Sequence, residues 1–243
     1  MHKFATSNSN QPPRRAVVLA AGRGKRLIPH TNNRPKPLLK LRGRPILSYV
    51  LEALSAAGVR KVCLVVGYLG QQIEAFVDGG RRWDLQTTLR WQREPVGTAH
   101  ALRLASDFIT APTFVLAADY ALPRSYLQAL KRAYSRSGMP LAVSLKSLPA
   151  EALAESSSVL FSDDGKIRRI IEKPQPDTAP SGIAASLIYI VPPQIRDYLQ
   201  NLSRSPRGEY ELVAVINRML ADGYEICGLQ QPPPPEWRLP VDS

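Results

Sequence analysis

The chain has 243 residues, a hydrophobic share of 44% and a formal net charge of +12, a composition typical of a globular protein with one large or two small domains. No apolar run approaches the roughly 20 residues that a membrane-spanning helix needs, which argues against a membrane protein. Residues 1–13 are polar and lack the apolar stretch of a signal peptide, so we expect a disordered tail there. The two cysteines, Cys63 and Cys227, lie in apolar segments as reduced core residues do, which favours a cytoplasmic location.

The first predicted element is a buried strand over residues 15–20 that leads into a basic, glycine-rich loop. Gly22 and Gly24 allow backbone N–H groups to approach an anion closely, and Arg26 and Lys36 add positive charge. Eleven Lys and Arg residues precede the first acidic residue, Glu52. The segment therefore predicts a phosphate-binding loop.

Two common phosphate-binding motifs do not fit this loop. A dinucleotide-binding fingerprint needs a third glycine where this chain has Leu27, and a P-loop needs Ser or Thr where Arg26 follows Gly24-Lys25. A plain turn between strand and helix is the simplest alternative, and motifs further along the chain argue against it.

The rest of the first half alternates between helical and strand-like periodicity. Helices are predicted at 45–57, 71–77, 98–108 and 122–134, and strands at 61–66, 86–91 and 113–118. This alternation predicts an α/β fold: a doubly wound, mostly parallel mixed sheet with helices on both faces. Ligands of such sheets bind beyond the carboxyl ends of the strands.

The second half, from about residue 139, contains more strands. Strands are predicted at 141–146, 158–162, 166–172, 184–191 and 224–229, and helices near 194–201 and 209–221. The sequence Asp163-Asp164-Gly165 predicts a hairpin turn between the second and third of these strands. We expect one continuous domain over residues 14–243, with its two halves meeting near residue 138.

Residues 19–27 (LAAGRGKRL) and 35–38 (PKPL) resemble the signature of the sugar-1-phosphate nucleotidyltransferases, also called nucleotide-sugar pyrophosphorylases. Those enzymes transfer a nucleoside monophosphate from a triphosphate to a sugar 1-phosphate and release pyrophosphate. The resemblance implies a Rossmann-like nucleotidyltransferase fold in which the first half (14–138) binds nucleotide and the second (139–243) binds sugar. It implies catalytic roles for Arg26, at the leaving pyrophosphate, and Lys36, at the α-phosphate. It also assigns nucleotide binding to Leu19, Ala20, Ala21, Gly22 and Gly24.

Gln92 and Gly97-Thr98 resemble the family's second nucleotide-binding motif. A glutamine amide offers a donor and an acceptor to a base edge, and Thr98 is placed to cap the following helix. This pairing favours UTP or dTTP as the donor. A helix cap without a nucleotide role is the alternative, and His100 is expected to be a packing or surface residue.

Asp119 ends a buried strand and resembles the family's aspartate for the essential divalent cation, Mg²⁺, although Ala118 stands where glycine is usual. A carboxylate capping a loop is the alternative. Residues 237–242 (WRLPVD) resemble a second metal motif, which makes Asp242 the other candidate ligand. Family members usually continue with a helix after this motif, so we expect either a short form or a missing C-terminal portion.

Residues 172–174 (EKP) and 208–212 (GEYEL) resemble sugar-site motifs and assign sugar binding to Glu172, Lys173 and Glu209. A surface salt bridge is the alternative for the first of these motifs. The chain departs from the family's sugar-site motifs at two places in the same half, each with two changed positions. Where the family often has polar residues or glycine, this chain has Ala185 and Leu187 at the first place and Val213 and Ala214 at the second. The acceptor is therefore unusual, or sugar binding has been lost.

The resemblance predicts a metal-dependent enzyme whose partners are a nucleoside triphosphate and a sugar 1-phosphate. Two alternatives stay open: a non-catalytic, regulatory relative that binds nucleotide-sugar, and transfer to a non-sugar phosphate such as phosphocholine. The chain lacks helix-turn-helix, zinc-spacing and aromatic RNA-binding motifs, so no specific nucleic acid is expected, and no membrane partner either. The oligomeric state is left open, a homo-oligomer included.

Overall fold

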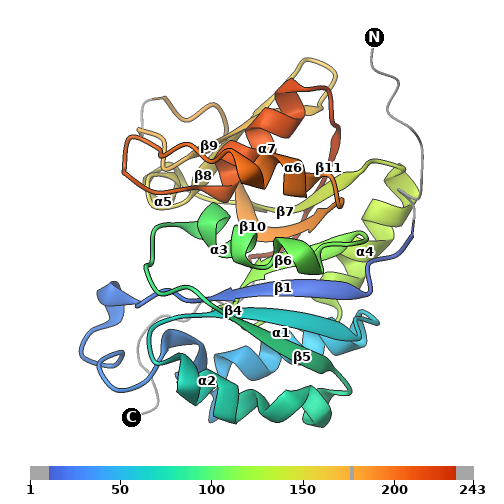
Figure 1. Cartoon of the computed structure of the whole chain (residues 1–243). Helices are drawn as coiled ribbons and strands as arrows, with labels where there is room; N and C mark the ends of the chain where they lie inside the picture. The colour runs from blue at the N-terminus through green and yellow to red at the C-terminus, as the bar shows by residue number, and fades with distance from the viewer. Residues whose placement is uncertain (1–10, 176–177, 234–243) are drawn as a thin grey trace.

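The computed structural model describes residues 11–175 and 178–233 and is built around one seven-stranded sheet (Figure 1). The strand order is β11-β7-β10-β6-β1-β4-β5. The strands are β1 (Arg15–Ala20), β4 (Lys61–Val66), β5 (Gln86–Trp91), β6 (Thr113–Ala117), β7 (Leu141–Ser147), β10 (Ile183–Val191) and β11 (Ile226–Gln230). Strand β10 pairs antiparallel with β6 and β7, and the other neighbours pair in parallel. The predicted mostly parallel mixed sheet is confirmed.

Helices cover both faces of the sheet, as Figure 1 shows. One face packs against α1 (Ile46–Ala56), α2 (Gly70–Val77) and α4 (Tyr126–Ser137), and the other against α3 (Thr98–Leu104), α6 (Ile195–Gln200) and α7 (Leu212–Ala221). Successive residues of the central strand β1 alternate between the two cores: Val18 faces the first and Val17 the second. Burial on both faces explains the unbroken apolar run of β1.

The predicted hairpin forms a small separate sheet from β8 (Ser157–Phe161) and β9 (Ile167–Glu172). Its turn contains Gly165 at φ +78°, a conformation that favours glycine. The Asn217 side chain on α7 donates to Ile170 O at 2.8 Å and accepts from Ile170 N at 2.9 Å. These two hydrogen bonds attach the hairpin, whose second strand ends at Glu172, to α7.

Three predicted helices differ in extent. The helix predicted over 98–108 ends at Leu104 and is followed by a separate 3₁₀ turn, η4 (Ser106–Phe108). Helix α4 begins at Tyr126 rather than at residue 122, because Pro123 disfavours helical geometry at the residue before it. Helix α7 begins at Leu212, since Glu211 is extended (φ −95°, ψ 133°).

The sequence analysis did not anticipate the short elements. These are η1 (Lys25–Leu27), η2 (Lys36–Leu38), β2 (Lys40–Leu41), β3 (Arg44–Pro45), η3 (Asp78–Trp83), η4 and α5 (Ala150–Leu153). Among the described residues no helix has the length and apolar character to cross a membrane. Residues 1–10 of the expected tail lie outside the described part of the chain.

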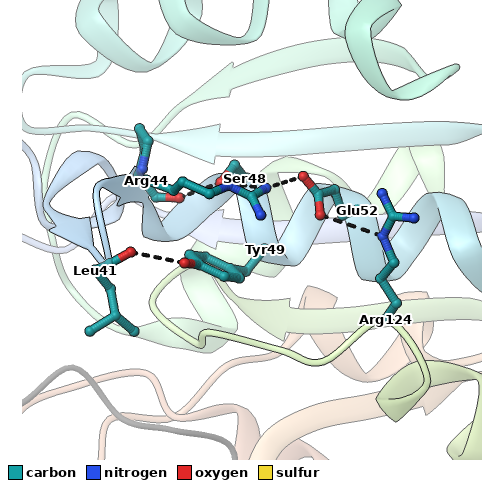
Figure 2. A network of polar contacts seen from close by, with 7 residues as sticks. Leu41, Arg44, Ser48, Tyr49, Glu52 and Arg124 are labelled. Atoms are coloured by element: carbon teal, nitrogen blue, oxygen red, sulfur yellow. Dashed lines mark hydrogen bonds and ion pairs between the residues drawn. The ribbon is translucent and has the colours of Figure 1, made fainter.

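A polar network joins the β2–β3 hairpin to α1 and to the loop before α4 (Figure 2). The Glu52 carboxylate pairs with Arg44 and, at 3.5 Å, with Arg124 Nε. Tyr49 Oη donates to Leu41 O at 2.8 Å. These contacts fix the segment that directly follows Lys36.

We expect Asn217→Ala to lower the free energy of unfolding by about 2 kcal/mol, because it removes the partner of both backbone polar groups of Ile170. Urea denaturation followed by circular dichroism measures the effect. Glu74→Ala, at an exposed site on α2, serves as the control and should change stability by less than about 0.5 kcal/mol. Equal stability of both variants would contradict the role given to Asn217.

Candidate functional site

Several segments meet beyond the carboxyl ends of β1, β4, β5 and β6. Gly67, directly after β4, lies between two of them: a Cβ atom there would be 2.9 Å from both Ala21 O and Gln92 O. Glycine is required for this close approach. Ala20 and Ala21 are buried and Leu19 is half-buried, so these residues contribute mainly backbone to the site. The sequence analysis did not single out Gly67, although a glycine at the end of a buried strand signals such an approach.

The basic loop after β1 folds around Gly24. This residue has φ +64° and ψ 38°, and a Cβ atom on it would lie 3.1 Å from Thr31 Cγ2 and 3.3 Å from Lys36 Cβ. Thr31 is buried and its hydroxyl donates to Gly24 O at 3.1 Å. A Cβ atom on Gly22 would have no neighbouring atom within 4 Å, so close packing does not explain why glycine stands at this position.

Residues near the start of α2 hold the far side of this loop. Tyr68 Oη donates to Asn32 O at 2.5 Å, and Gln72 Nε2 donates to Asn33 O at 2.9 Å. The Arg23 guanidinium lies 5.2 Å from the centre of the Tyr68 ring. Tyr68 and Gln72 were missed by the sequence analysis, because their partners lie more than thirty residues away in the chain.

Lys36 and Asp119 come together at the centre of the site. Lys36 Nζ donates to Asp119 Oδ2, and the two side chains are 29% and 31% exposed. The sequence analysis assigned these residues to different roles, catalysis and metal binding. Their contact shows that the loop after β1 and the end of β6 form one charged centre.

Arg26 lies apart from that centre. Its side chain is 79% exposed, and its Nη1 donates to Glu155 Oε2 at 3.0 Å. Lys173 Nζ lies 3.9 Å from the same carboxylate oxygen. Glu155, another residue that the sequence analysis missed, thus joins one predicted catalytic cation to one predicted sugar-site cation.

Of the two predicted metal ligands, Asp119 is described, and Asp242 lies outside the described residues. Within residues 11–175 and 178–233, no group of three or more His, Cys, Asp and Glu side chains could hold a metal ion. The single Asp119 carboxylate beside the basic glycine-rich loop fits Mg²⁺, which usually takes one or two protein carboxylates together with phosphates and water.

The Gln92 side chain is buried and its orientation is fixed. Its Nε2 donates to Gly97 O at 3.1 Å and lies 3.0 Å from His100 Nδ1. Burial, followed by the charge of Arg103, lowers the pKa of His100, so the imidazole is neutral at pH 7 and its Nδ1 accepts this hydrogen bond. Both amide hydrogens are thus used within the protein. The expectation that this amide offers a base edge a donor as well as an acceptor is therefore wrong, and only its carbonyl oxygen is left to accept. His100 is therefore more than packing: it orients Gln92.

Gly97 and Thr98 join the two halves of the chain. Gly97 has φ +122°, and a Cβ atom on it would lie 2.3 Å from Tyr210 O. Tyr210 N donates to Val96 O, and Ala99 N donates to Tyr210 O, each at 2.8 Å. The prediction that Thr98 caps its own helix is wrong, because Gly97 occupies the cap position; Thr98 Oγ1 instead accepts from Leu212 N of α7 at 2.9 Å.

The predicted sugar-site acid Glu172 lies beside Glu211. Burial raises the pKa of Glu172 to about 7, and the Glu211 carboxylate adds to the effect, against the opposing charges of Arg207 and Lys173. Arg207 Nη2 pairs with Glu211 Oε1 at 2.6 Å. Glu209 is exposed and affects the pKa of Glu172 less than Glu211 does. Glu211, which was not among the predicted site residues, therefore influences Glu172 more than Glu209 does, and the sugar-binding role of Glu209 stays a prediction.

Ala185 and Leu187, two of the positions that depart from the family's sugar-site motifs, lie on β10 at an irregularity of the sheet. The register with β7 shifts between Ala185 and Tyr189. Leu187 N donates to Tyr120 Oη at 3.1 Å, and Ser157 Oγ bonds both the N–H and the C=O of Ala185. These backbone groups are satisfied within the protein, and Tyr120 links the irregularity to Asp119.

Comparison with known proteins agrees with this arrangement. A family model described as "Nucleotidyl transferase" matches residues 15–232. The nucleotidyltransferase Agl11 of low-salt glycan biosynthesis in Haloferax volcanii is 29% identical over 87% of this chain, which spans 58% of that protein's length. UTP–glucose-1-phosphate uridylyltransferase AglF of the same organism is 30% identical, with 93% of this chain and 90% of AglF covered.

A solved structure shares the fold. The crystal structure of a UDP-glucose pyrophosphorylase complexed with UDP-glucose superimposes with a TM-score of 0.79 at 21% identity, over 90% of each chain. The family model and AglF confirm the resemblance stated from the signature loop. Because the model matches residues 15–232 and AglF is 30% identical over 93% of this chain, the chain belongs to the nucleotidyl transferase family, which includes the sugar-1-phosphate nucleotidyltransferases that it resembles.

Proposed function

We propose that this protein is an enzyme that transfers the nucleoside monophosphate of UTP or dTTP to a sugar 1-phosphate and releases pyrophosphate. The contact between Lys36 and Asp119 carries the proposal, because it places a cation and a carboxylate beside the phosphate-binding loop. The carboxyl edge of a parallel sheet is where such ligands bind. The named substrates of the relative AglF, UTP and glucose 1-phosphate, support the assignment.

The reaction needs charge neutralisation more than proton transfer. An oxygen of the sugar phosphate attacks the α-phosphorus of the triphosphate, the bond from that phosphorus to the bridging oxygen breaks, and pyrophosphate leaves with the electron pair. The attacking phosphate is already ionised near neutral pH, so no general base is required. Lys36 would contact the α-phosphate and Arg26 the leaving pyrophosphate, positioning the groups and stabilising the transition-state charge.

Members of this family are generally metal-dependent, and we propose Mg²⁺ as the ion. Asp119, and Asp242 outside the described residues, would hold it. The ion would supply positive charge to the reacting phosphates. The Lys36 contact holds the Asp119 carboxylate in place at the edge of the sheet.

The fixed orientation of Gln92 supports a uracil or thymine base. With its amide hydrogens bonded to Gly97 O and His100 Nδ1, its carbonyl oxygen can accept the N3–H of either pyrimidine. Cytosine N3 and adenine N1 are acceptors, so this carbonyl would reject those two bases. Guanine N1–H is a donor like uracil N3–H, so the preference for UTP or dTTP over GTP rests on the resemblance of the Gln92 and Gly97-Thr98 motif. A mismatch would leave buried polar groups unpaired.

Glu172 and Lys173 are proposed to contact the acceptor, together with Glu211 and Glu209. Transfer to a non-sugar phosphate is the second candidate, since Ala185 and Leu187 on β10 have no polar side-chain atoms to bind sugar hydroxyls. Pyrophosphate release with UTP and a panel of sugar 1-phosphates and phosphocholine tests both. Release with a sugar 1-phosphate supports the main proposal, release with phosphocholine alone supports the second, and nucleotide-sugar binding without any release indicates a regulatory relative.

A cytoplasmic location stays a prediction, supported by the free thiols of buried Cys63 and half-buried Cys227. The division into a nucleotide half and a sugar half near residue 138 is likewise proposed. Both halves contribute strands to the one sheet.

We expect Lys36→Ala or Arg26→Ala to lower turnover about 100-fold or more, because each removes a cation that stabilises transition-state charge. Neither should lower the melting temperature much, since both side chains are partly or largely exposed. Steady-state pyrophosphate release and thermal melting provide the two measurements. Lys40→Ala is the matched control, and near-normal turnover of the Lys36 or Arg26 variant would refute its assigned role.

Chelation by EDTA should abolish activity, and added Mg²⁺ should restore it. Asp119→Asn should need a much higher Mg²⁺ concentration for half-maximal rate, since it removes a formal charge from a site for a hard cation. A Mg²⁺ titration of the wild type, Asp119→Asn and the control Asp107→Asn measures this. Full activity in EDTA would rule out the metal-assisted mechanism.

UTP or dTTP should outcompete GTP, ATP and CTP as the donor. Gln92→Leu should both weaken binding and relax this preference, while Gln86→Leu, at the opposite end of β5, should do neither. Ratios of kcat/KM for the five nucleotides measure the effect. A clear preference of the wild type for GTP would overturn the base assignment and leave the phosphate chemistry intact.

A further inference from the structure

Glu155 holds a single carboxylate between two cations that come from different halves of the chain. It lies between α5 and β8, whereas Arg26 lies in the loop after β1 and Lys173 directly after β9. Glu155 Oε2 is 3.0 Å from Arg26 Nη1 and 3.9 Å from Lys173 Nζ. Lys173 N donates to Ser156 O at 2.7 Å, which fixes the Glu155 segment beside Lys173.

In the proposed reaction, on which this inference rests, Arg26 contacts the leaving pyrophosphate and Lys173 contacts the acceptor, a sugar 1-phosphate. Two like charges brought close together repel each other unless an anion lies near them. In the structure the anion beside both cations is Glu155. A bound triphosphate or pyrophosphate carries more negative charge, so Arg26 can turn from the carboxylate to the phosphates.

We propose that Glu155 is an internal competitor of substrate phosphate. Its carboxylate pairs with Arg26 and lies near Lys173, so phosphate must displace it from Arg26, and its negative charge then stays close to the bound phosphates. Both effects weaken the binding of nucleoside triphosphate and pyrophosphate, and so favour the release of pyrophosphate. Glu155 is thus a positioning residue that sets affinity rather than a catalytic one.

The exposure of the ion pair limits the size of the effect. The side chains of Arg26 and Glu155 are 79% and 68% exposed, and such pairs are typically weak and screened by salt. A change in affinity of a few fold is therefore expected, and it should depend on ionic strength.

Calorimetric titration with pyrophosphate tests the inference on the full chain. Glu155→Gln keeps the size of the side chain and removes its charge, and should bind pyrophosphate about three- to fivefold more tightly at low salt. The gain should shrink at about 0.5 M salt. The KM for UTP should fall by a similar factor. Glu151→Gln, an exposed acid on the neighbouring helix α5, is the control and should bind like the wild type.

Arg26→Ala separates this inference from the proposed function. If Arg26→Ala weakens pyrophosphate binding and Glu155→Gln does not strengthen it, the role of Glu155 is overturned and the proposed function stands. If Arg26→Ala leaves pyrophosphate binding unchanged, both the phosphate role of Arg26 and the inference fail. In the Arg26→Ala background the gain from Glu155→Gln should be smaller, and an equal gain would contradict competition for Arg26.

Discussion

A site that binds a triphosphate must bring several cations together, and the protein has to tolerate that concentration of charge when no substrate is present. Here each of the two catalytic candidates is paired with an acid from a distant part of the chain. Lys36 is paired with Asp119 and Arg26 with Glu155. The first pair also connects the end of β6 to the loop after β1, so the same contact that neutralises charge fixes the centre of the site.

The two halves of the site are joined by main chain as well as by charge. Tyr210 approaches Gly97 so closely that a side chain would not fit, and its backbone pairs with residues on either side of that glycine. Thr98 then accepts the first free N–H of α7. The nucleotide motif and the 208–212 motif are therefore built as one unit. A change in the position of Tyr210 can reach Gln92 through Gly97, whose carbonyl accepts from the Gln92 amide.

Much of this architecture could be predicted from the sequence. A continuous apolar strand such as β1 implies burial on both faces. The predicted parallel order of the strands implies that the segments after β1, β5 and β6 share one edge of the sheet, and the structure has β1, β4, β5 and β6 in parallel. What could not be predicted are the contacts between side chains far apart in the chain: Glu155 with Arg26, Tyr68 with Asn32, and Thr98 with Leu212. The cap role expected for Thr98 failed because local spacing cannot reveal a partner over a hundred residues away. The proximity of Glu211 to Glu172 could not be predicted either, because the two acids lie on different elements, while the sugar-binding role of Glu209 stays a prediction.

The central claim is that the α-phosphorus of the nucleotide is attacked by the acceptor phosphate. Parallel reactions with UTP labelled at the α-phosphate and at the γ-phosphate, each with and without a sugar 1-phosphate, test it directly. We predict that the α-label enters a nucleotide-sugar only when the sugar 1-phosphate is present, and that the γ-label is recovered in pyrophosphate. Transfer of the γ-label to the acceptor, or its release as inorganic phosphate, would contradict the account.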